Sequence, residues 1–333
     1  MDDSRASPSA ALLSLVRSEY GLAVSGDERD LGGSYNLNLL VAGSFVVRVY
    51  GSWVSAERVA AVQGVREGLR LAGWPIAPLR RALSGADFVA FGQRVVEVET
   101  YVDAGSPMAS WDELSAGLPW LARLHDALRC GPCPPAVTEA PVANHLFAAR
   151  VHEDTEEAFA ALRSWVSTAT ERRYLAAAEQ LVAVVAEVDR FEVPAQLVHG
   201  DFWHNNVILD GSRLVRLGDF DFLGVRPRVD DLALTLFFAN EHHGRDDLSQ
   251  ARIDQLRRLV DRYDEASEHP LTEVERAALP YAIARTPLTF VRDLADGTPF
   301  HRQELVDLRG PEYEWALRAL DDPRWLSLGG TAP

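Results

Sequence analysis

The chain has 333 residues, of which 47% are apolar and 25% charged, so it is long enough for two subdomains and apolar enough to bury a core. Its 33 basic residues against 49 acidic ones leave a formal charge of -16, which argues against nucleic acid as a partner, because that binding depends on basic contacts to phosphate. All the basic residues are arginine, since the sequence contains no lysine. Chemistry that needs an ε-amine, such as a Schiff base or a Walker A lysine, is therefore excluded.

The first hundred residues predict a strand-rich lobe. Apolar side chains at helical spacing predict helices at residues 10–20 and 54–71. Short β-branched runs bounded by turn residues predict strands at residues 28–31, 37–41, 45–50, 88–91 and 95–102. We therefore expect an N-terminal lobe over residues 1–103.

Beyond residue 103 the apolar pattern changes to long helical periods. Helices are predicted at residues 111–129, 143–166, 171–188, 228–240, 248–266 and 272–294. Short apolar runs at 196–198, 207–209 and 214–217 interrupt them, and loops beside such strands commonly carry function. The whole pattern predicts an α+β, bilobal fold with a mostly helical second lobe over residues 104–333.

Several other kinds of protein do not fit. The N-terminus does not resemble a signal peptide, and no run of 18 apolar residues occurs, so we expect a cytoplasmic protein without a membrane partner. Cys130 and Cys133 have the spacing of a redox pair but lie outside a βαβ unit. His152-Glu153 lacks the second histidine of a helical zinc motif.

The residues that carry chemistry lie around the short strands. Asp201 is followed by Asn206 five positions later and by Asp219 thirteen beyond that. Phosphoryl transfer needs a carboxylate for the attacking hydroxyl, and an amide oxygen and a second carboxylate for Mg²⁺. Magnesium prefers hard oxygen ligands and takes only a few from protein, which fits Asn206 and Asp219.

The string His199-Gly200-Asp201 with Asn206, followed by Asp219-Phe220-Asp221, resembles the aminoglycoside phosphotransferase and choline kinase family. The resemblance implies the fold of protein kinases, Asp201 as catalytic residue, and Mg²⁺ bound by Asn206 and Asp219. In this family the histidine equivalent to His199 mostly braces the loop. Asp221 is expected either to contact a second metal ion or to cap a turn.

The resemblance extends into the first lobe and to residue 240. Ser34 resembles part of the family's nucleotide-binding hairpin, and Arg48 stands where the family usually has the lysine that binds the α- and β-phosphates. Guanidinium can bind phosphate through two hydrogen bonds, so the change is compatible with function. The acidic partner of Arg48 is expected on the following helix, where Glu57 is favoured over Glu67.

Two further expectations follow from the resemblance. Glu99 and Tyr101, where the lobes join, would form the hinge whose backbone binds adenine, although an ordinary edge strand remains the alternative. Asp231 is expected to anchor the catalytic loop by hydrogen bonds.

The predicted function is a small-molecule kinase that transfers the γ-phosphoryl group of ATP or GTP to a hydroxyl of an antibiotic or related natural product, inactivating it. An amino alcohol such as homoserine or choline is the alternative acceptor. A catalytically inactive binding module is disfavoured because Asp201, Asn206 and Asp219 are all present. No segment ending in Ala-Pro-Glu follows Asp221, which argues against a protein kinase.

The charge of the acceptor stays open. An acidic run at residues 153–157, or Glu241, could face a cationic acceptor, although acidic residues also stabilise a helix N-terminus. Arg285 and Arg292, seven residues apart on one predicted helix, could face an anionic one instead.

Overall fold

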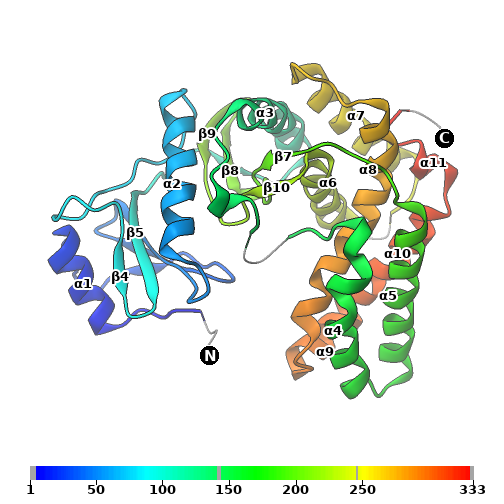
Figure 1. Cartoon of the computed structure of the whole chain (residues 1–333), viewed down its shortest axis with the longest axis horizontal. Helices are drawn as coiled ribbons and strands as arrows, with labels where there is room; N and C mark the ends of the chain where they lie inside the picture. The colour runs from blue at the N-terminus through cyan, green and yellow to red at the C-terminus, as the bar shows by residue number, and fades with distance from the viewer. Residues whose placement is uncertain (1–4, 141–143, 245–246, 331–333) are drawn as a thin grey trace. The chain divides into compact units, whose positions relative to one another are not determined.

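The computed structural model describes residues 5–140, 144–244 and 247–330. The chain divides into two compact units (Figure 1). The first contains residues 1–107, 131–141 and 206–221, and the second contains residues 108–130, 142–205 and 222–333. The first unit therefore takes in two segments that the sequence pattern placed with the C-terminal lobe.

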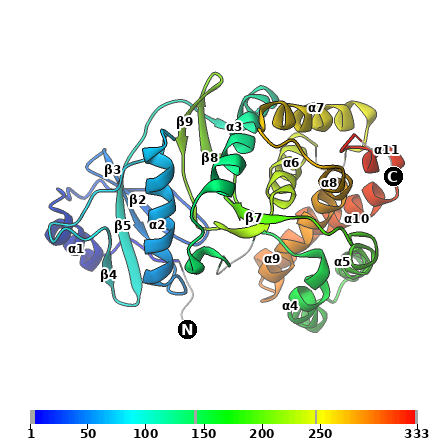
Figure 2. The ribbon, with the colours of Figure 1, turned by 45° about the horizontal axis from the view of Figure 1, so that its top comes forward.

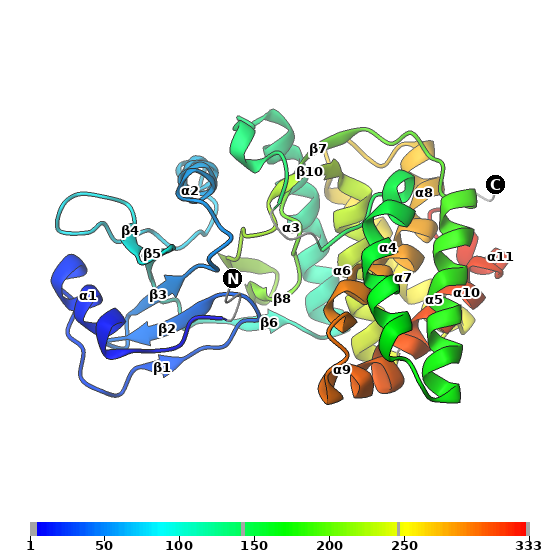
Figure 3. The ribbon, with the colours of Figure 1, turned by 60° about the horizontal axis from the view of Figure 1, so that its bottom comes forward.

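The first unit is built on an antiparallel sheet with strand order β1-β2-β3-β5-β4. Its strands are β1 (Arg29–Asp30), β2 (Leu37–Val41), β3 (Phe45–Val49), β4 (Val89–Phe91) and β5 (Arg94–Thr100). Two helices, α1 (Ala10–Tyr20) and α2 (Ala56–Leu71), lie on opposite sides of the sheet (Figure 3). All seven elements match the predicted ones within a few residues.

Because side chains alternate along a strand, β3 and β5 each have one apolar face toward α1 and one face with charged residues toward α2. Val47 and Val49 on β3, with Val96 and Val98 on β5, pack against α1 in an apolar core. Successive strand residues point to opposite faces, so Arg48 and Glu97 point to the α2 side. These two residues are directly opposite each other in the antiparallel register.

Two small sheets carry the loops with the predicted catalytic motif. β7 (Ala195–Val198) pairs with β10 (Gly224–Pro227), and β6 (Ser106–Met108), β8 (His204–Asp210) and β9 (Arg213–Leu217) form a three-stranded sheet. The predicted runs at 196–198, 207–209 and 214–217 are confirmed as β7, β8 and β9. β6 and β10 are too short and too rich in Pro and Gly to show a strand pattern.

The second unit is otherwise helical (Figure 2). Its longer helices are α3 (Trp111–Cys130), α4 (Val151–Trp165), α5 (Ala169–Val188), α6 (Arg228–Gly244), α7 (Gln250–Ala266), α8 (Glu273–Arg285) and α10 (Gly310–Leu320). Shorter helical segments are η1 (Pro135–Val137) in the first unit and, in the second, η2 (Ala148–Arg150), η3 (Thr286–Leu294), α9 (Pro299–Glu304), η4 (Leu305–Arg309) and α11 (Pro323–Leu326). The central helix α6 is buried over most of its length and packs against α8.

Two predicted helices have different bounds. The helix predicted at 143–166 is a short η2 followed by α4, and residue 143 lies outside the described residues. The helix predicted at 272–294 ends as an α-helix at Arg285, and Pro287 follows within the 3-10 segment η3. Proline lacks the N–H that a continuing α-helix needs. Within residues 5–140, 144–244 and 247–330, no helix is long and apolar enough to span a membrane.

Candidate active site

The first unit brings Arg48 together with two predicted metal ligands. The Nη2 atom of Arg48 lies 2.6 Å from Oδ1 of Asp219 and 3.0 Å from Oδ2 of Asp221. The same Asp221 oxygen accepts a hydrogen bond from the side-chain amide of Asn36, whose own oxygen accepts from the Gly51 N–H at 2.9 Å. Strand β3 and the Asp219-Phe220-Asp221 loop are thus joined through charged and amide groups.

The backbone brings Asn206 close to Asp219. The N–H of Gly218 donates to the carbonyl of Asn206 at 2.9 Å, which puts Asn206 beside the residue that precedes Asp219. Asp219 has a φ of 59°, a left-handed conformation that is rare for residues other than glycine. Such conformations cost free energy and cluster at functional sites, so the loop holds Asp219 in place against a local preference.

Burial and neighbouring charges shift two groups of this cluster. Desolvation by itself lowers the pKa of Arg48, but the carboxylates of Asp219 and Asp221 raise it well above its ordinary value. Desolvation raises the pKa of Asp221, and the Asp219 charge adds to this while Arg48 opposes it. The cluster therefore holds the largely buried carboxylate of Asp221 close to the partly exposed one of Asp219, and positive charge is needed to balance the two.

The donors of this cluster fit a magnesium ion. Asp219, Asp221 and the Asn206 amide are hard oxygen ligands, and the Asp219 side chain keeps 30% of its surface exposed. No group of three or more His, Cys, Asp or Glu that could hold a metal ion occurs in the described part of the chain. Magnesium keeps several waters and binds substrate phosphates, so one or two carboxylates with an amide are sufficient.

The expected partner of Arg48 is corrected by the structure. Glu57 lies on the exposed face of α2, and Glu67 forms a surface ion pair with Arg70 at 2.6 Å. The carboxylates that pair with Arg48 are Asp219 and Asp221 instead. Glu57 lies in the first turn of α2, two residues after the N-cap Ser55, so its carboxylate favours the helix N-terminus.

Helix α2 contributes a cation to the sheet rather than a carboxylate. Nη1 of Arg66 lies 2.7 Å from Oε1 of Glu97, and its Nη2 pairs with Glu99. The amide of Gln63 donates to the second oxygen of Glu97 at 2.7 Å. The ion pairs between helix and sheet therefore have the opposite polarity from the predicted one.

The predicted nucleotide-binding residues are placed as follows. Ser34 is exposed between β1 and β2. The Glu99 carboxylate is buried and paired with Arg66, so any contact with a nucleotide must come from its backbone. The N–H of Tyr101 donates to the Ser44 carbonyl at 2.8 Å, so its hydrogen is already committed within the sheet.

The second unit holds Asp201 in a loop that follows β7. The side-chain amide of Asn144 donates to Oδ1 of Asp201 at 3.0 Å and to the Gly200 carbonyl at 3.3 Å. The N–H of Asp201 donates to Nδ1 of His199 at 3.2 Å. His199 is fully buried and accepts this hydrogen bond, so it supports the loop. Gly200 has a φ of 82°, and a Cβ there would collide with the backbone of Phe222.

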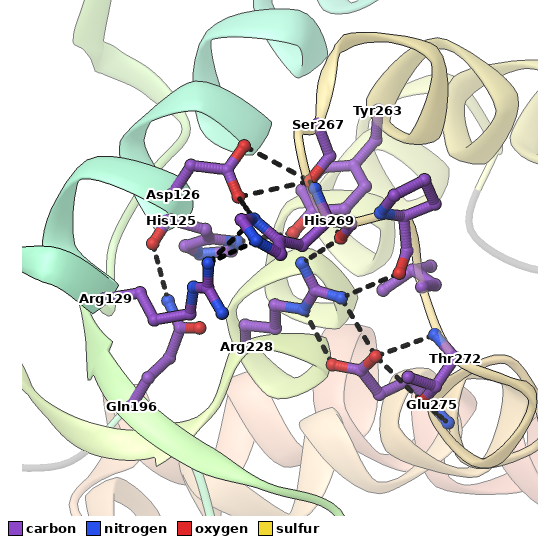
Figure 4. Close-up of polar contacts among 12 residues, drawn as sticks. His125, Asp126, Arg129, Gln196, Arg228, Tyr263, Ser267, His269, Thr272 and Glu275 are labelled. Carbon is purple, nitrogen blue, oxygen red and sulfur yellow. Dashed lines mark hydrogen bonds and ion pairs between the residues drawn. The ribbon is translucent and has the colours of Figure 1, made fainter.

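Behind the loop lies a hydrogen-bonded chain that begins at Asp231. Oδ1 of Asp231 accepts from the Gly200 N–H at 3.1 Å, and Oδ2 lies 3.1 Å from Nε2 of His125. Nδ1 of His125 lies 2.7 Å from the hydroxyl of Tyr263 (Figure 4). Because the Asp231 carboxylate only accepts, Nε2 of His125 must carry the hydrogen. Asp231 thus anchors the loop, as expected.

The network in Figure 4 continues into the segment between α7 and α8. Asp126 on α3 accepts from the N–H of Glu268 at 2.7 Å, and Arg228 at the start of α6 donates to the His269 carbonyl and to Glu275, each at 2.6 Å. These bonds fix the starts of α6 and α8 to the end of α3. The helix that carries Asp231 is therefore held at its N-terminal end.

Three of the charged residues considered for the acceptor, Arg285, Arg292 and Asp154, are engaged in other pairs, whereas Glu156 and Glu157 are exposed on α4. Arg285 is buried and pairs with Asp189 and Asp230, so it is not an open anion site, and burial lowers its pKa to about 10. Arg292 donates to the Asp154 carbonyl. Asp154 also pairs with Arg150, at 3.1 Å. Cys130 and Cys133 are free and exposed.

Sequence reasoning missed three residues of these clusters. Glu97 has a signal, because an antiparallel register between residues 45–50 and 95–102 puts a carboxylate opposite Arg48. Arg66 follows from Glu97 only once the helix is packed on that face. Asn144 falls at the start of the helix predicted at 143–166 but precedes η2 in the structure, and no sequence signal pointed to its contact with Asp201.

Comparison with known proteins shows the family and the fold of the chain. The sequence matches the phosphotransferase enzyme family over residues 28–277, and no curated protein matches the chain. A microcompartment-associated aminopropanol kinase has the same fold with a TM-score of 0.69 at 16% identity, covering 95% of this chain and 98% of that chain. An amicoumacin kinase, solved with AMP-PNP and Ca²⁺, gives 0.67 at 13% identity, covering 91% and 92%.

A third solved structure is an aminoglycoside phosphotransferase from Alicyclobacillus acidocaldarius. Its TM-score is 0.59 at 18% identity, and the match covers 96% of this chain and 97% of that chain. These likenesses confirm the predicted α+β, protein-kinase-like fold. The family match spans the segment from β1 to α8, with both halves of the predicted catalytic motif, so the chain belongs to the phosphotransferase enzyme family.

Proposed function

We propose that this chain is a small-molecule kinase that transfers the γ-phosphoryl group of ATP or GTP to a hydroxyl of an antibiotic or related natural product. The observation that carries the proposal is the placement of Asp201. Its carboxylate is oriented by Asn144, and its loop is anchored through Gly200 to the buried Asp231. A carboxylate held this firmly, followed in the sequence by a second motif that supplies metal ligands, fits what phosphoryl transfer to a hydroxyl requires.

In this mechanism Asp201 accepts or orients the proton of the acceptor hydroxyl. The hydroxyl oxygen forms a bond to the γ-phosphorus, and the bond from that phosphorus to the oxygen bridging to the β-phosphate breaks. The leaving group is the nucleoside diphosphate, and the hydroxyl proton passes to Asp201. The chain supplies positioning and charge stabilisation rather than a covalent intermediate.

On the donor side, Arg48 would hold the α- and β-phosphates. Its Nε is buried and has no hydrogen-bond partner in the described part of the chain, so one donor of the guanidinium is not committed to Asp219 or Asp221. Asn206, Asp219 and Asp221 would hold Mg²⁺. Bound there, the ion supplies positive charge for the phosphates as the transferred group moves.

The purine would lie against the backbone around Glu99 and Tyr101, with Ser34 near the phosphates. Since the Tyr101 N–H is committed to Ser44, this residue can contribute only its carbonyl or its ring. The support for these roles is the family pattern together with the position of these residues at the end of β5 and before β2.

An amino alcohol is the second candidate acceptor. It is supported by the fold likeness to the aminopropanol kinase, which covers nearly the full length of both chains. The inactive-module alternative is disfavoured, because Asp201, Asn206 and Asp219 are present and held by specific bonds.

The test is release of nucleoside diphosphate with a panel of hydroxylated antibiotics and amino alcohols, each with ATP and GTP and with Mg²⁺. We expect turnover with at least one acceptor, and a loss of about 10²–10⁴-fold in kcat for Asp201→Asn, with nucleotide affinity within a few-fold of wild type. Wild-type turnover by Asp201→Asn contradicts the mechanism. Absence of turnover with every acceptor and both nucleotides contradicts the proposed function for these compounds.

A further inference from the structure

Successive residues on one face of α6 contact successive residues of the loop that contains Asp201. Asp231, Thr235, Phe238 and His242 are spaced by four, three and four residues, which puts them on one side of a helix. Asp231 accepts from the N–H of Gly200, and Thr235 donates to the carbonyl of Phe202 at 2.7 Å. The next two residues along this face contact Trp203 and His204 through their rings. The order of contacts on α6 is therefore the order of residues in the loop.

Burial changes along this face. Asp231 and Thr235 are fully buried, Phe238 is half-buried and His242 is exposed. The first half of the face is thus an anchor that holds the loop by hydrogen bonds. Phe238 and His242, in the second half, are in contact with solvent. Support of the loop therefore does not explain why aromatic rings occupy these two positions.

The exposed half carries stacked rings. The ring centroids of Trp203 and Phe238 lie 4.1 Å apart, with 18° between the ring planes. The ring centroids of His204 and His242 lie 5.4 Å apart, with 11° between the planes. The ring centroids of Trp203 and His242 are 5.3 Å apart. We call these four residues, Trp203, His204, Phe238 and His242, the ring surface.

The ring surface lies next to the catalytic carboxylate in the chain and in space. The N–H of Trp203 donates to the carbonyl of Asp201 at 3.0 Å, so the two residues share one tight turn. His204, the next residue, has a φ of 39°, which is unfavourable for a residue with a side chain. This strained turn directs the chain so that both rings of the loop reach the rings on α6.

The chemistry of the surface indicates what it recognises. None of its four side chains is an arginine or a carboxylate, although the carboxylate of Glu113 lies close enough to interact electrostatically with His204. Stacked aromatic rings bind other flat rings in offset or edge-to-face geometry, and ligand sites use a few such rings as their apolar part. Half-exposed rings contribute less to stability than buried ones, because part of their apolar surface stays in water. A bound ring could cover that surface.

We propose that the ring surface is the acceptor-recognition site and selects hydroxyl compounds that carry a flat, unsaturated ring. The proposal rests on the proposed function, because it takes Asp201 as the residue that meets the acceptor hydroxyl. It names a substrate class that separates ring-bearing acceptors from aliphatic amino alcohols and from non-planar amino sugars. Trp203 is its central residue, since it touches both Phe238 and His242.

The experiment uses two acceptors that differ only in the ring. 2-Amino-1-phenylethanol and 1-amino-2-propanol share a secondary hydroxyl and a primary amine, and differ by phenyl in place of methyl. In the wild type we expect kcat/KM to favour the phenyl compound by about tenfold. In Trp203→Ala this preference should fall by about 3- to 10-fold through a raised KM for the phenyl compound. Trp203→Phe keeps a ring and should retain most of the preference.

The matched control is Trp120→Ala, which removes a half-buried tryptophan that packs under Arg123 on α3. This variant should keep the wild-type preference. The proposal is overturned if the wild type shows no preference for the phenyl compound, or if Trp203→Ala lowers kcat/KM equally for both acceptors, because either result means that the rings only support the loop.

A failure of the proposed kinase function can be distinguished from a failure of the ring-surface proposal. If neither compound is phosphorylated, calorimetric titration of both compounds into wild type and Trp203→Ala decides the question without turnover. Tighter binding of the phenyl compound that is lost in Trp203→Ala supports the ring surface even though the kinase assignment has failed for these acceptors. Equal binding of the two compounds to the wild type overturns it.

Discussion

The two units hold the residues proposed for catalysis by different means. In the first unit, Arg48, Asp219 and Asp221 are held by pairs of formal charges, and the neighbouring Arg66, Glu97 and Glu99 form a second charged group. In the second unit, the loop of Asp201 is held by directed hydrogen bonds: the Gly200 N–H donates to the Asp231 carboxylate, the Asn144 amide donates to Asp201, and the Thr235 hydroxyl donates to the loop backbone. Charge pairs can exchange one partner for a phosphate or a metal ion, whereas directed hydrogen bonds fix a position.

This difference has an energetic consequence. A buried ion pair adds little net stability, since desolvation offsets the attraction, but removing one partner leaves a buried charge and is costly. A buried carboxylate that accepts several hydrogen bonds keeps its charge at a lower pKa, so its contribution depends on pH. The first unit is therefore most sensitive to loss of a partner, and the second to protonation.

The largest effect is expected at Glu97. Glu97→Ala removes the carboxylate that pairs with the buried Arg66 and accepts from Gln63, so we expect a loss of about 3 kcal/mol in the free energy of unfolding, measured by urea denaturation. Glu67→Ala is the matched control, because its ion pair with Arg70 is exposed and should change stability by less than about 1 kcal/mol. Equal effects of the two substitutions would show that the Glu97 cluster contributes no more than a surface pair.

The next effect concerns Asp231 and its dependence on pH. Burial by itself raises the pKa of Asp231, but the hydrogen bond from His125 and the nearby histidines lower it to about 2. A lowered pKa contributes stability above the unfolded pKa, and this contribution is lost as the pH falls through the folded value. Asp231→Asn should therefore cost about 2 kcal/mol at pH 5–7, and less as the pH falls from about 4 toward 2.

Urea denaturation of the wild type and Asp231→Asn at pH 7, 5, 4 and 3 measures this difference. The Glu171 carboxylate in the capping box of α5 also has a pKa lowered to about 2, but it is present in both proteins and cancels. A difference that stays constant down to pH 3, or grows there, contradicts a charged Asp231 anchor.

A smaller effect is expected for Arg48. Arg48→Ala should raise the KM for nucleotide by at least about tenfold, and Arg48→Lys should recover part of the loss, since a point charge still reaches phosphate but lacks the planar fork. Steady-state kinetics against nucleotide measures both. Arg81→Ala, which removes an exposed arginine paired with Asp87, is the control and should leave this KM unchanged. An Arg48→Ala enzyme with the KM of the control would mean that another arginine binds the phosphates.

The smallest effect on stability is expected at Thr235, whose hydroxyl donates a hydrogen bond to the loop backbone. Thr235→Val removes the hydrogen bond to the Phe202 carbonyl and should cost about 1 kcal/mol of stability. Thr289→Val is the matched control, because the Thr289 hydroxyl is also buried but has no hydrogen-bond partner among the residues described. It should be neutral or slightly stabilising. Thermal denaturation of both variants tests the comparison, and indistinguishable losses would remove Thr235 from the loop support.

The sequence alone determined the elements with strong local patterns. Helices α1, α5 and α7 and strands β2, β3 and β9 were predicted within about two residues, because a helix or strand buries side chains at a period that a short window reveals. The motif from His199 to Asp221 likewise predicted Asp201, Asn206 and Asp219 as one set, since phosphoryl transfer restricts both residue type and spacing. Irregular segments without such a period, among them β6, β10 and the start of α4, were missed or misplaced.

Tertiary structure decided which charges and rings meet. Arg48 pairs with Asp219 and Asp221 rather than with Glu57, and α2 offers Arg66 to Glu97, because strand register and helix packing bring together residues about 30 to 170 positions apart. Asn144 reaches Asp201 from a segment that the sequence pattern predicted as the start of a helix and that precedes η2 in the structure. The ring surface could be predicted in part, because the helical spacing of Asp231, Thr235, Phe238 and His242 shows that they share one face of α6. That this face lies along the loop from Gly200 to His204 is set by long-range packing, which no local period encodes.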